Sequence, residues 1–335
     1  RQGGVLIDHT TVSADIARVS LDSLSLVDGG SSLAVAGTTG SSLYVGGLFG
    51  LGSVTVTGDA ATLQVASGDF SGSLSGAVGL EKVGTTDSIL FLRGINNYSE
   101  ATTVTSGWLA VDTDATLGLS NAVTVGEDGV LAFINAKNAS ALTIVNSGLV
   151  QFEDETSAGD AQIDNLGSVV FREGSLASSV TVTGETGSWT VFRDLADGGN
   201  SVFNMAVSSL FDISGSTNGV TVGSIDGAGD ILLGSKNLGL GVNDTDMTLS
   251  GVIWDGGLSG GVSGSLTKLG LGTLTLDGDN NFTGGTTLVD GRLVVGSTRA
   301  LGRGDATLVG GELSAGAGNH LIFVEGDYLQ TAPAT

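Results

Sequence analysis

Hydrophobic and polar residues alternate in short runs along almost the whole chain. Examples are "SVTVTG" (53–58), "LTIVNS" (142–147) and "TLTLDG" (273–278), and each run ends in Gly or Ser. Alternation with a period of two, bounded by turn residues, predicts β-strands. The best helical candidate, residues 13–24, fits two short strands equally well. We therefore predict an all-β protein.

A five-residue phrase ending in Phe returns at nearly constant spacing in the middle of the chain. The intervals are 19, 19, 21 and 19 residues, between Phe133, Phe152, Phe171, Phe192 and Phe211. A repeat of about 20 residues with short strands and Gly corners is typical of a parallel β-solenoid, in which each coil contacts only its neighbours. Equivalent residues of successive coils would stack about 4.8 Å apart. The five phenylalanines are therefore predicted to form a buried column.

The end of this series allows more than one assignment of the core residues. An insertion before Phe192 could turn Trp189 and Val191 inward instead, and either Leu210 or Phe211 could be the core residue of the next coil. The residues just after each Phe predict two ion pairs one coil apart, Glu153–Arg172 and Arg193–Asp212. We expect these pairs on a solvated edge, where each contributes less than ~1 kcal/mol.

Composition and charge exclude several classes of function. The chain has 335 residues, a net charge of −23, 57 Gly, one Pro and no Cys. Nucleic acid and anionic membranes would repel such a chain, so no nucleic-acid partner is expected. The lack of Cys excludes disulfides, thiolate metal sites and a cysteine nucleophile. The sequence has no signal peptide and no long apolar segment, and its ends, Arg1 and "TAPAT", suggest an excised fragment.

Candidate catalytic residues are few. The two histidines, His9 and His320, would lie far apart in a stack of coils. The stretch "GLSGG" (257–261) matches G-x-S-x-G, but its Gly/Ser surroundings do not form the strand-to-helix turn that a nucleophile elbow needs. The acidic run 152–160 could supply paired carboxylates to an enzyme acting on polysaccharide, although only 12 Lys and Arg are present to bind uronates. We expect no catalytic residue.

One segment has the spacing of a calcium loop. Asp277, Asp279 and Asn281 stand at positions 1, 3 and 5, but Leu288 occupies the twelfth position, where the loop needs Glu. We therefore expect no metal and no cofactor.

A longer pattern covers residues 264–315, which are rich in Gly and alternating Leu. Its residues are Leu266, Lys268, Gly270, Gly272, Leu274, Leu276, Gly278, Asn280, Phe282, Gly284, Gly285, Thr286, Leu288, Gly291, Leu293 and Val295. This segment resembles the passenger-associated transport repeat of bacterial autotransporters. A degenerate copy covers residues 80–133 and keeps Lys82, Gly84, Gly94, Asn96, Tyr98, Thr102, Val104, Gly107, Leu109 and Val111. Two extra residues after Gly84 suggest a longer corner, and Ser99–Ala101 replaces Thr-Gly-Gly and so loses the glycine turn.

The resemblance implies a right-handed parallel β-helix with coils of about 20 residues. It would be a single passenger fragment over residues 1–335, with residues 316–335 starting a C-terminal region before the barrel. It also implies secretion to the bacterial cell surface through the protein's own outer-membrane β-barrel translocator, which this chain does not include. Residues 268–295 would then guide secretion and folding and carry no chemistry.

The sequence is compatible with three functions. The first is a β-helical stalk that presents an adhesive or self-associating surface to a host-surface or matrix ligand, or to other cells. The second is a scaffold whose subtilisin-like protease domain lies outside this fragment. The third, a β-helix enzyme acting on polysaccharide, is the weakest, because it needs carboxylates that converge on one face.

Overall fold

The structure is a computed structural model, and it describes residues 3–7, 10–15, 18–135, 139, 141–318, 322 and 324–331. The chain folds as a parallel β-solenoid of about 15 turns, with coils about 21 residues apart. The predicted fold class, an all-β parallel β-helix, is therefore confirmed. The described residues contain no helix that could cross a membrane.

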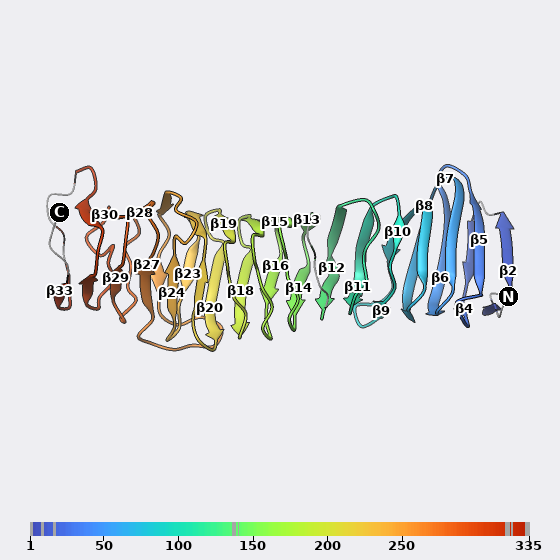
Figure 1. Ribbon diagram of the computed structural model, residues 1–335, viewed down its shortest axis with the longest axis horizontal. Helices are drawn as coiled ribbons and strands as arrows, with labels where there is room; N and C mark the ends of the chain where they lie inside the picture. The colour runs from blue at the N-terminus through green and yellow to red at the C-terminus, as the bar shows by residue number, and fades with distance from the viewer. Residues whose placement is uncertain are drawn as a thin grey trace. The chain divides into compact units, whose positions relative to one another are not determined.

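The chain divides into two compact units, residues 1–156 and 157–335, which are described separately below (Figure 1). The strands of unit 1 are β1 (Val5–Ile7), β2 (Thr11–Asp15), β3 (Arg18–Leu21), β4 (Leu24–Leu26), β5 (Ser32–Gly37), β6 (Ser41–Gly50), β7 (Ser53–Phe70), β8 (Ser73–Lys82), β9 (Ile89–Leu92), β10 (Asn97–Tyr98), β11 (Thr102–Asp112), β12 (Ala122–Ile134), β13 (Thr143–Asn146) and β14 (Leu149–Glu153).

Unit 2 has shorter strands. They are β15 (Gln162–Asn165), β16 (Ser168–Phe171), β17 (Thr181–Gly184), β18 (Trp189–Asp194), β19 (Val202–Met205), β20 (Leu210–Ser216), β21 (Val220–Val222), β22 (Ser224–Gly227), β23 (Asp230–Leu232), β24 (Asn237–Leu240), β25 (Met247–Leu249), β26 (Ile253–Trp254), β27 (Ser265–Lys268), β28 (Thr273–Leu276), β29 (Thr286–Leu288), β30 (Arg292–Val295), β31 (Ala306–Leu308), β32 (Glu312–Ala315) and β33 (Tyr328–Gln330).

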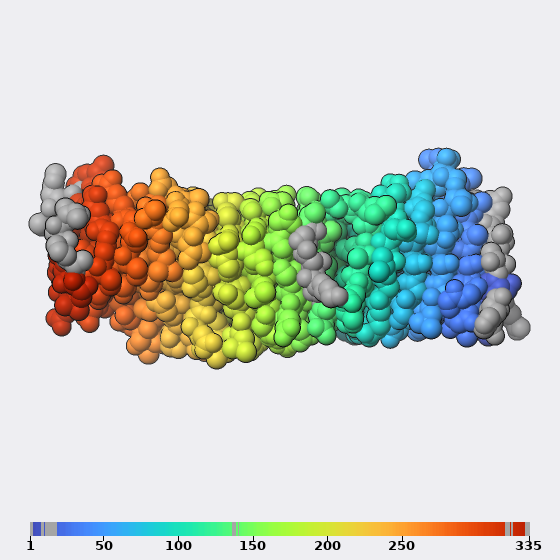
Figure 2. All heavy atoms as spheres, viewed as in Figure 1, coloured from blue at the N-terminus to red at the C-terminus, as the bar shows by residue number. Residues whose placement is uncertain are grey.

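Strands within each unit pair in parallel with the strand one coil away. In unit 1, Leu63 pairs with Leu43 of the preceding coil and with Leu80 of the following coil. In unit 2, Thr286 pairs with Leu266 and with Ala306. Figure 2 shows the result as bands of similar colour across each unit. Because side chains alternate along a strand, in-register stacking places the same face of every coil inside.

Buried columns of apolar side chains run through each unit. In unit 1 one column contains Phe70, Leu92, Val111, Phe133 and Phe152, and each is at most 2% exposed. The rings of Phe133 and Phe152 are stacked, with centroids 5.3 Å apart and planes 7° apart. In unit 2 the rings of Phe171 and Phe192 are stacked at 4.8 Å. Burial of each such side chain contributes roughly 1.5–3 kcal/mol.

Phe211 does not lie opposite Phe192, as the predicted column requires, because Phe211 pairs with Thr190. Val191 pairs with Asp212, but Arg193 pairs with Gly215, so a β-bulge lies between the two positions. Phe211 is fully buried, and its ring still contacts Phe192, at 5.5 Å and tilted by 44°. Phe211, and not Leu210, is therefore the core residue of its coil.

The predicted surface pairs do not form as expected. Arg193 does not lie opposite Asp212, because Val191 already pairs with Asp212 and Arg193 pairs with Gly215, so that pair is wrong. Asp212 is fully buried, and Glu153 is only 7% exposed beside Gln151, whose side-chain amide donates to it. Neither carboxylate lies on a solvated edge. The Glu153–Arg172 pair would join the two units and stays a prediction.

One coil of unit 2 is longer than its neighbours. Leu238 pairs with Leu266, 28 residues later, whereas Leu266 pairs with Thr286, 20 residues later. The additional residues form a glycine-rich loop between β26 and β27, residues 255–263, which we call the strap.

Candidate functional site

The two repeats found in the sequence place the same four kinds of side chain inside the solenoid. Each repeat buries a lysine, an asparagine, an aromatic residue and a threonine, all at most 3% exposed. The four pairs are Lys82 and Lys268, Asn96 and Asn280, Tyr98 and Phe282, and Thr102 and Thr286. The first repeat lies in unit 1 and the second in unit 2.

The lysines end strands β8 and β27, and their ammonium groups lie at corners of the coil. Lys82 Nζ donates to the carbonyl oxygens of Val83 (2.6 Å) and Ser106 (3.0 Å) and to Ser88 Oγ (2.9 Å). An ammonium group has three protons, so these three acceptors satisfy it completely. Ser106 belongs to the following coil, because Lys82 pairs with Val104. The lysine therefore connects two consecutive coils.

Lys268 repeats this arrangement in unit 2. Its Nζ donates to the carbonyl oxygens of Leu269, Gly270 (2.7 Å) and Asp290 (3.4 Å). Asp290 follows Leu288, the residue of the next coil with which Lys268 pairs. Both lysines thus bond to carbonyls of their own corner and to one carbonyl of the following corner.

A glycine lies close to the first ammonium group. Gly107 has φ +72°, and a Cβ atom there would be 2.6 Å from Lys82 Nζ and 2.5 Å from the carbonyl oxygen of Ser88. The equivalent Gly291 of the second repeat has φ +71°. Any side chain at Gly107 would be strained by the backbone conformation and would also displace the lysine.

Burial perturbs the acid–base properties of both lysines. It lowers the pKa of Lys82 to about 8, because the charged form loses hydration. It also lowers the pKa of Lys268, although the carboxylates of Asp290, Asp244 and Asp246 favour the charged form there. A neutral amine has only two N–H groups, so loss of the proton would leave one of the three acceptors unpaired.

The asparagines connect three consecutive coils. Asn96 Oδ1 accepts from Leu74 N of the preceding coil (2.9 Å), and Asn96 Nδ2 donates to Thr116 O of the following coil (2.7 Å). Asn280 Oδ1 accepts from Ile253 N (2.7 Å), and its Nδ2 donates to Ala300 O (2.6 Å). Each asparagine satisfies buried backbone groups that the strand ladders leave unpaired.

The aromatic and threonine positions differ in one detail. In the first repeat the hydroxyl groups of Tyr98 and Thr102 share a hydrogen bond of 2.6 Å, and burial raises the pKa of Tyr98. In the second repeat Phe282 has no hydroxyl group, and Thr286 Oγ1 donates instead to Leu301 O (2.9 Å). The threonine hydroxyl is therefore satisfied in both repeats.

The remaining predicted residues of the second repeat shape its corners. Gly270, Gly285 and Gly291 have positive φ. A Cβ atom at Gly272, Gly278 or Gly284 would overlap backbone oxygen atoms of the preceding coil or of the strap. Val295 is 1% exposed and pairs with Leu276. Their role in secretion stays a prediction.

The departures in the first repeat have structural consequences. The two extra residues after Gly84 fall in a turn closed by Ser88 N and Thr85 O (3.0 Å), and this turn delivers the Ser88 hydroxyl to Lys82. Ala101 replaces Gly285 without positive φ, yet the bond from Leu80 N to Ala101 O (3.2 Å) matches the bond from Leu266 N to Gly285 O (3.0 Å). Sequence reasoning did not identify Ser88 as a ligand of the lysine.

Asp212 is a second residue whose role the sequence did not reveal. Its carboxylate accepts from Ser214 N (2.7 Å) and from Leu258 N of the strap (2.7 Å). Ser259 N of the strap donates to Ser214 Oγ (3.0 Å). Asp255 holds the base of the strap through Gly264 N (2.9 Å). The strap therefore lies across the outward face of β20.

The residues weighed for catalysis do not assemble into a site. The described part of the chain has no group of three or more His, Asp or Glu side chains that could hold a metal ion. His9 and His320 lie outside the described residues. The "GLSGG" motif belongs to the strap, between two strands. Asp277, Asp279 and Asn281 are all exposed in the irregular segment between β28 and β29.

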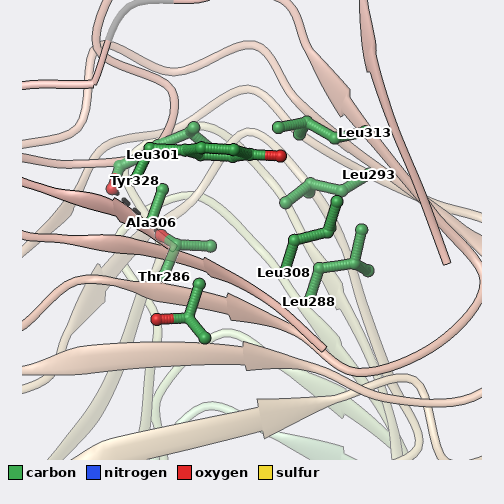
Figure 3. A pocket seen from close by; sticks show the side chains of 9 residues that line it. Thr286, Leu288, Leu293, Leu301, Ala306, Leu308, Leu313 and Tyr328 are labelled. Atoms are coloured by element: carbon green, nitrogen blue, oxygen red, sulfur yellow. Dashed lines mark hydrogen bonds between the residues drawn. The ribbon is translucent and has the colours of Figure 1, made fainter. Parts of the chain in front are cut away.

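Hollows in the described part of the chain range from about 10 Å³ to about 430 Å³. One in unit 2 measures about 10 Å³ and is lined by Leu288, Leu293, Leu301 and Leu308 beside the ring of Tyr328 (Figure 3). That volume holds at most one water molecule. A larger hollow of about 430 Å³, beside Tyr44 and Gln64 in unit 1, is open to solvent. The lysine, asparagine and threonine side chains of the two repeats, in contrast, lie inside the coils.

Comparison with known proteins identifies the two repeats. The family model of the passenger-associated transport repeat matches residues 80–111 and 266–295. These repeats are characteristic of autotransporter passenger domains, so the resemblance drawn from the sequence is confirmed. No curated protein and no solved structure matches the chain.

Proposed function

We propose that this chain is the β-helical stalk of an autotransporter passenger, that it presents an adhesive or self-associating surface outside the cell, and that it has no enzymatic activity. The observation that carries the proposal is the pair of transport repeats built into a parallel β-solenoid. Secretion to the cell surface follows from the family of these repeats. The protein's own outer-membrane translocator is its expected partner during export.

The burial of the repeat side chains separates two roles, internal support of the fold and outward contacts. Lys82, Asn96, Lys268 and Asn280 are directed into the solenoid and bond to its backbone. They brace the fold and leave the outward side chains free for contacts. Bracing of this kind suits a chain that must fold after export, because each coil is stabilised only by its neighbours.

Some of the outward side chains are large, apolar and exposed. Several large apolar residues at corners and turns are more than 60% exposed, among them Ile95, Leu119, Leu195, Val207 and Val262. Apolar side chains mark a contact site where they gather into a contiguous patch, and single exposed ones are ordinary on a protein surface. The net charge of −23 opposes nonspecific association, so contacts would need a complementary partner.

A display experiment tests the proposal. Bacteria producing the whole protein are compared with bacteria in which this region is replaced by an unrelated β-solenoid of equal coil number, and a tag verifies equal surface display. We expect replacement to reduce clumping, or attachment to host cells or matrix, because the outward side chains change while the length does not. Unchanged clumping and attachment would show that the region is a passive spacer.

A further inference from the structure

We infer that unit 1 carries a docking face for a cationic amphipathic peptide segment, on the outward side of β9, β11, β12 and β14. The inference rests on the proposed adhesive role, and it names the face and the chemistry of its partner. The four strands lie side by side in Figure 1, and each pairs in parallel with the next.

The outward side of these four strands is mostly apolar. Leu109, Leu131 and Val150 are fully buried, so the residues that alternate with them point outward. The strand register places these outward residues in two adjacent rows. One row is Ile89, Trp108, Val130 and Leu149, and the other is Phe91, Ala110, Ala132 and Gln151.

The two rows form a contiguous patch, which we call the apolar face. Neighbouring strands lie about 4.8 Å apart, so each side chain lies beside the equivalent one of the next coil. Ile89 is 38% exposed, and Trp108 is half-buried. At the other end of β11 and β12, in contrast, the outward residues include Thr103, Thr105 and Thr124. A contiguous apolar patch of this kind marks a site of contact with another molecule.

Exposed carboxylates line one border of the apolar face. Asp87 lies two residues before Ile89, and Glu127 and Asp128 lie just before Val130. No described lysine or arginine forms an ion pair with these three carboxylates. Their negative field therefore attracts a partner with positive charge.

The opposite border shows how a cation is held on this face. The guanidinium group of Arg93 lies 4.9 Å from the centre of the Phe91 ring. Arg93 also donates to the carboxylates of Asp69 (2.9 Å) and Asp112. A cation over an aromatic ring is stabilised by the electrons of the ring, and here two carboxylates add to that attraction. Basic side chains of a partner would find a similar environment between Trp108 and the unpaired carboxylates.

These observations decide between possible occupants. A peptide with apolar side chains on one side and Lys or Arg beside them would cover the apolar face and meet the carboxylates of its border. A second copy of the chain would bring the same acidic border, and the net charge of −23 opposes its approach. The partner that fits is therefore a cationic amphipathic segment.

Binding of a defined peptide to the purified chain tests the inference. The probe is a fluorescein-labelled amphipathic peptide of Leu and Lys, and anisotropy measures its binding. The controls are a scrambled peptide of the same composition and an amphipathic peptide of Leu and Glu. We expect saturable binding of the probe alone, weakened by high salt, because salt screens exposed charges. No binding of the probe, or equal binding of the controls, overturns the inference.

Variants of the chain locate the site. Val130→Thr combined with Leu149→Thr should weaken binding by about tenfold, because the apolar area covered by the peptide is reduced. Thr is common in strands and already occupies outward positions of β11 and β12, so the fold should be retained. Val145→Thr is the matched control and should leave binding unchanged, because Val145 is an exposed residue of β13 outside the apolar face.

A second pair of variants keeps the test decisive if the first does not fold. Asp87→Asn combined with Asp128→Asn leaves the apolar side chains in place, and it should weaken binding by about threefold and reduce the salt dependence. Unchanged affinity in both double variants overturns the inference. So does a dimer, measured by sedimentation, that Val130→Thr with Leu149→Thr dissociates, because the face would then bind a second copy.

This assay and the display experiment fail independently. A chain that binds no peptide can still support adhesion through other surfaces. A chain that supports no adhesion can still bind the peptide in solution.

Discussion

Replacement of Asn280 by Ala tests the bracing role of the repeats most simply. The side chain is 1% exposed and satisfies two buried backbone groups, the N–H of Ile253 and the carbonyl of Ala300. Truncation leaves both groups without a partner, and each unpaired buried group costs about 1–3 kcal/mol. The free energy of unfolding of unit 2 should therefore fall by roughly 2–6 kcal/mol.

The neighbouring residue provides a matched control. Asn281 is exposed, and the bond at this position is made by its backbone N–H to Ile253 O (3.0 Å), which Asn281→Ala retains. That variant should change stability by less than about 0.5 kcal/mol. In unit 1, Asn96 is the buried residue and Asn97 is its exposed neighbour. Asn96→Ala should lower the free energy of unfolding by more than Asn280→Ala does, because Asn96 also donates to Gly94 O (3.0 Å).

Urea unfolding measures both effects in chains that keep one of the three tryptophans and carry Phe at the other two, with Trp108 reporting on unit 1 and Trp254 on unit 2. Trp254 is well placed because it directly follows Ile253, whose N–H loses its partner. The reasoning is refuted if Asn280→Ala destabilises unit 2 no more than Asn281→Ala does.

Three further predictions concern other buried polar groups. Burial lowers the pKa of Lys82 from 10.5 to about 8, so the charged form is penalised in the folded chain. This penalty is fully present below pH 8, and it is relieved as the pH rises from 8 to 10.5. The free energy of unfolding of the wild type, measured against Lys82→Met, should therefore rise by about 1–2 kcal/mol across that window, because solvent near the ammonium group screens part of the effect, and a flat difference would contradict it. Ser201→Ala removes a buried hydroxyl group that has no partner, so the denaturation midpoint should stay equal or increase, whereas a clear decrease would reveal a hidden partner. Asp212→Ala removes the acceptor of Leu258 N, so limited proteolysis at Leu258 and Ser259 should accelerate several-fold; unchanged cleavage would show that the carboxylate does not hold the strap.

Most of the fold follows from periodicity. The alternation of "SVVF" and the spacing of 19 to 21 residues are enough to predict parallel stacking, because a solenoid repeats one local geometry. The bulge after Phe192 could not be predicted in this way. It accompanies the burial of Asp212 beneath the strap, and the strap lies 46 residues further along the chain, beyond any local pattern.

The sequence identified the lysines of the repeats but not their location. Lysine is almost never fully buried unless it is paired. Strand parity contained a usable signal, since in "SLTK" Leu266 faces the core, Thr267 faces outward and Lys268 faces the core again. The acceptors could not be predicted, because they are backbone carbonyls whose positions depend on corner geometry.

Selective acylation of the lysines tests the central claim, that the lysines of the transport repeats lie inside the coils. The chain has four lysines, Lys82, Lys137, Lys236 and Lys268. Acetic anhydride labelling of the native chain, read by peptide mass spectrometry, should modify Lys236 and leave Lys82 and Lys268 unmodified, and all four should react after denaturation. If Lys82 and Lys268 react in the native chain as fast as Lys236, the internal bracing does not exist.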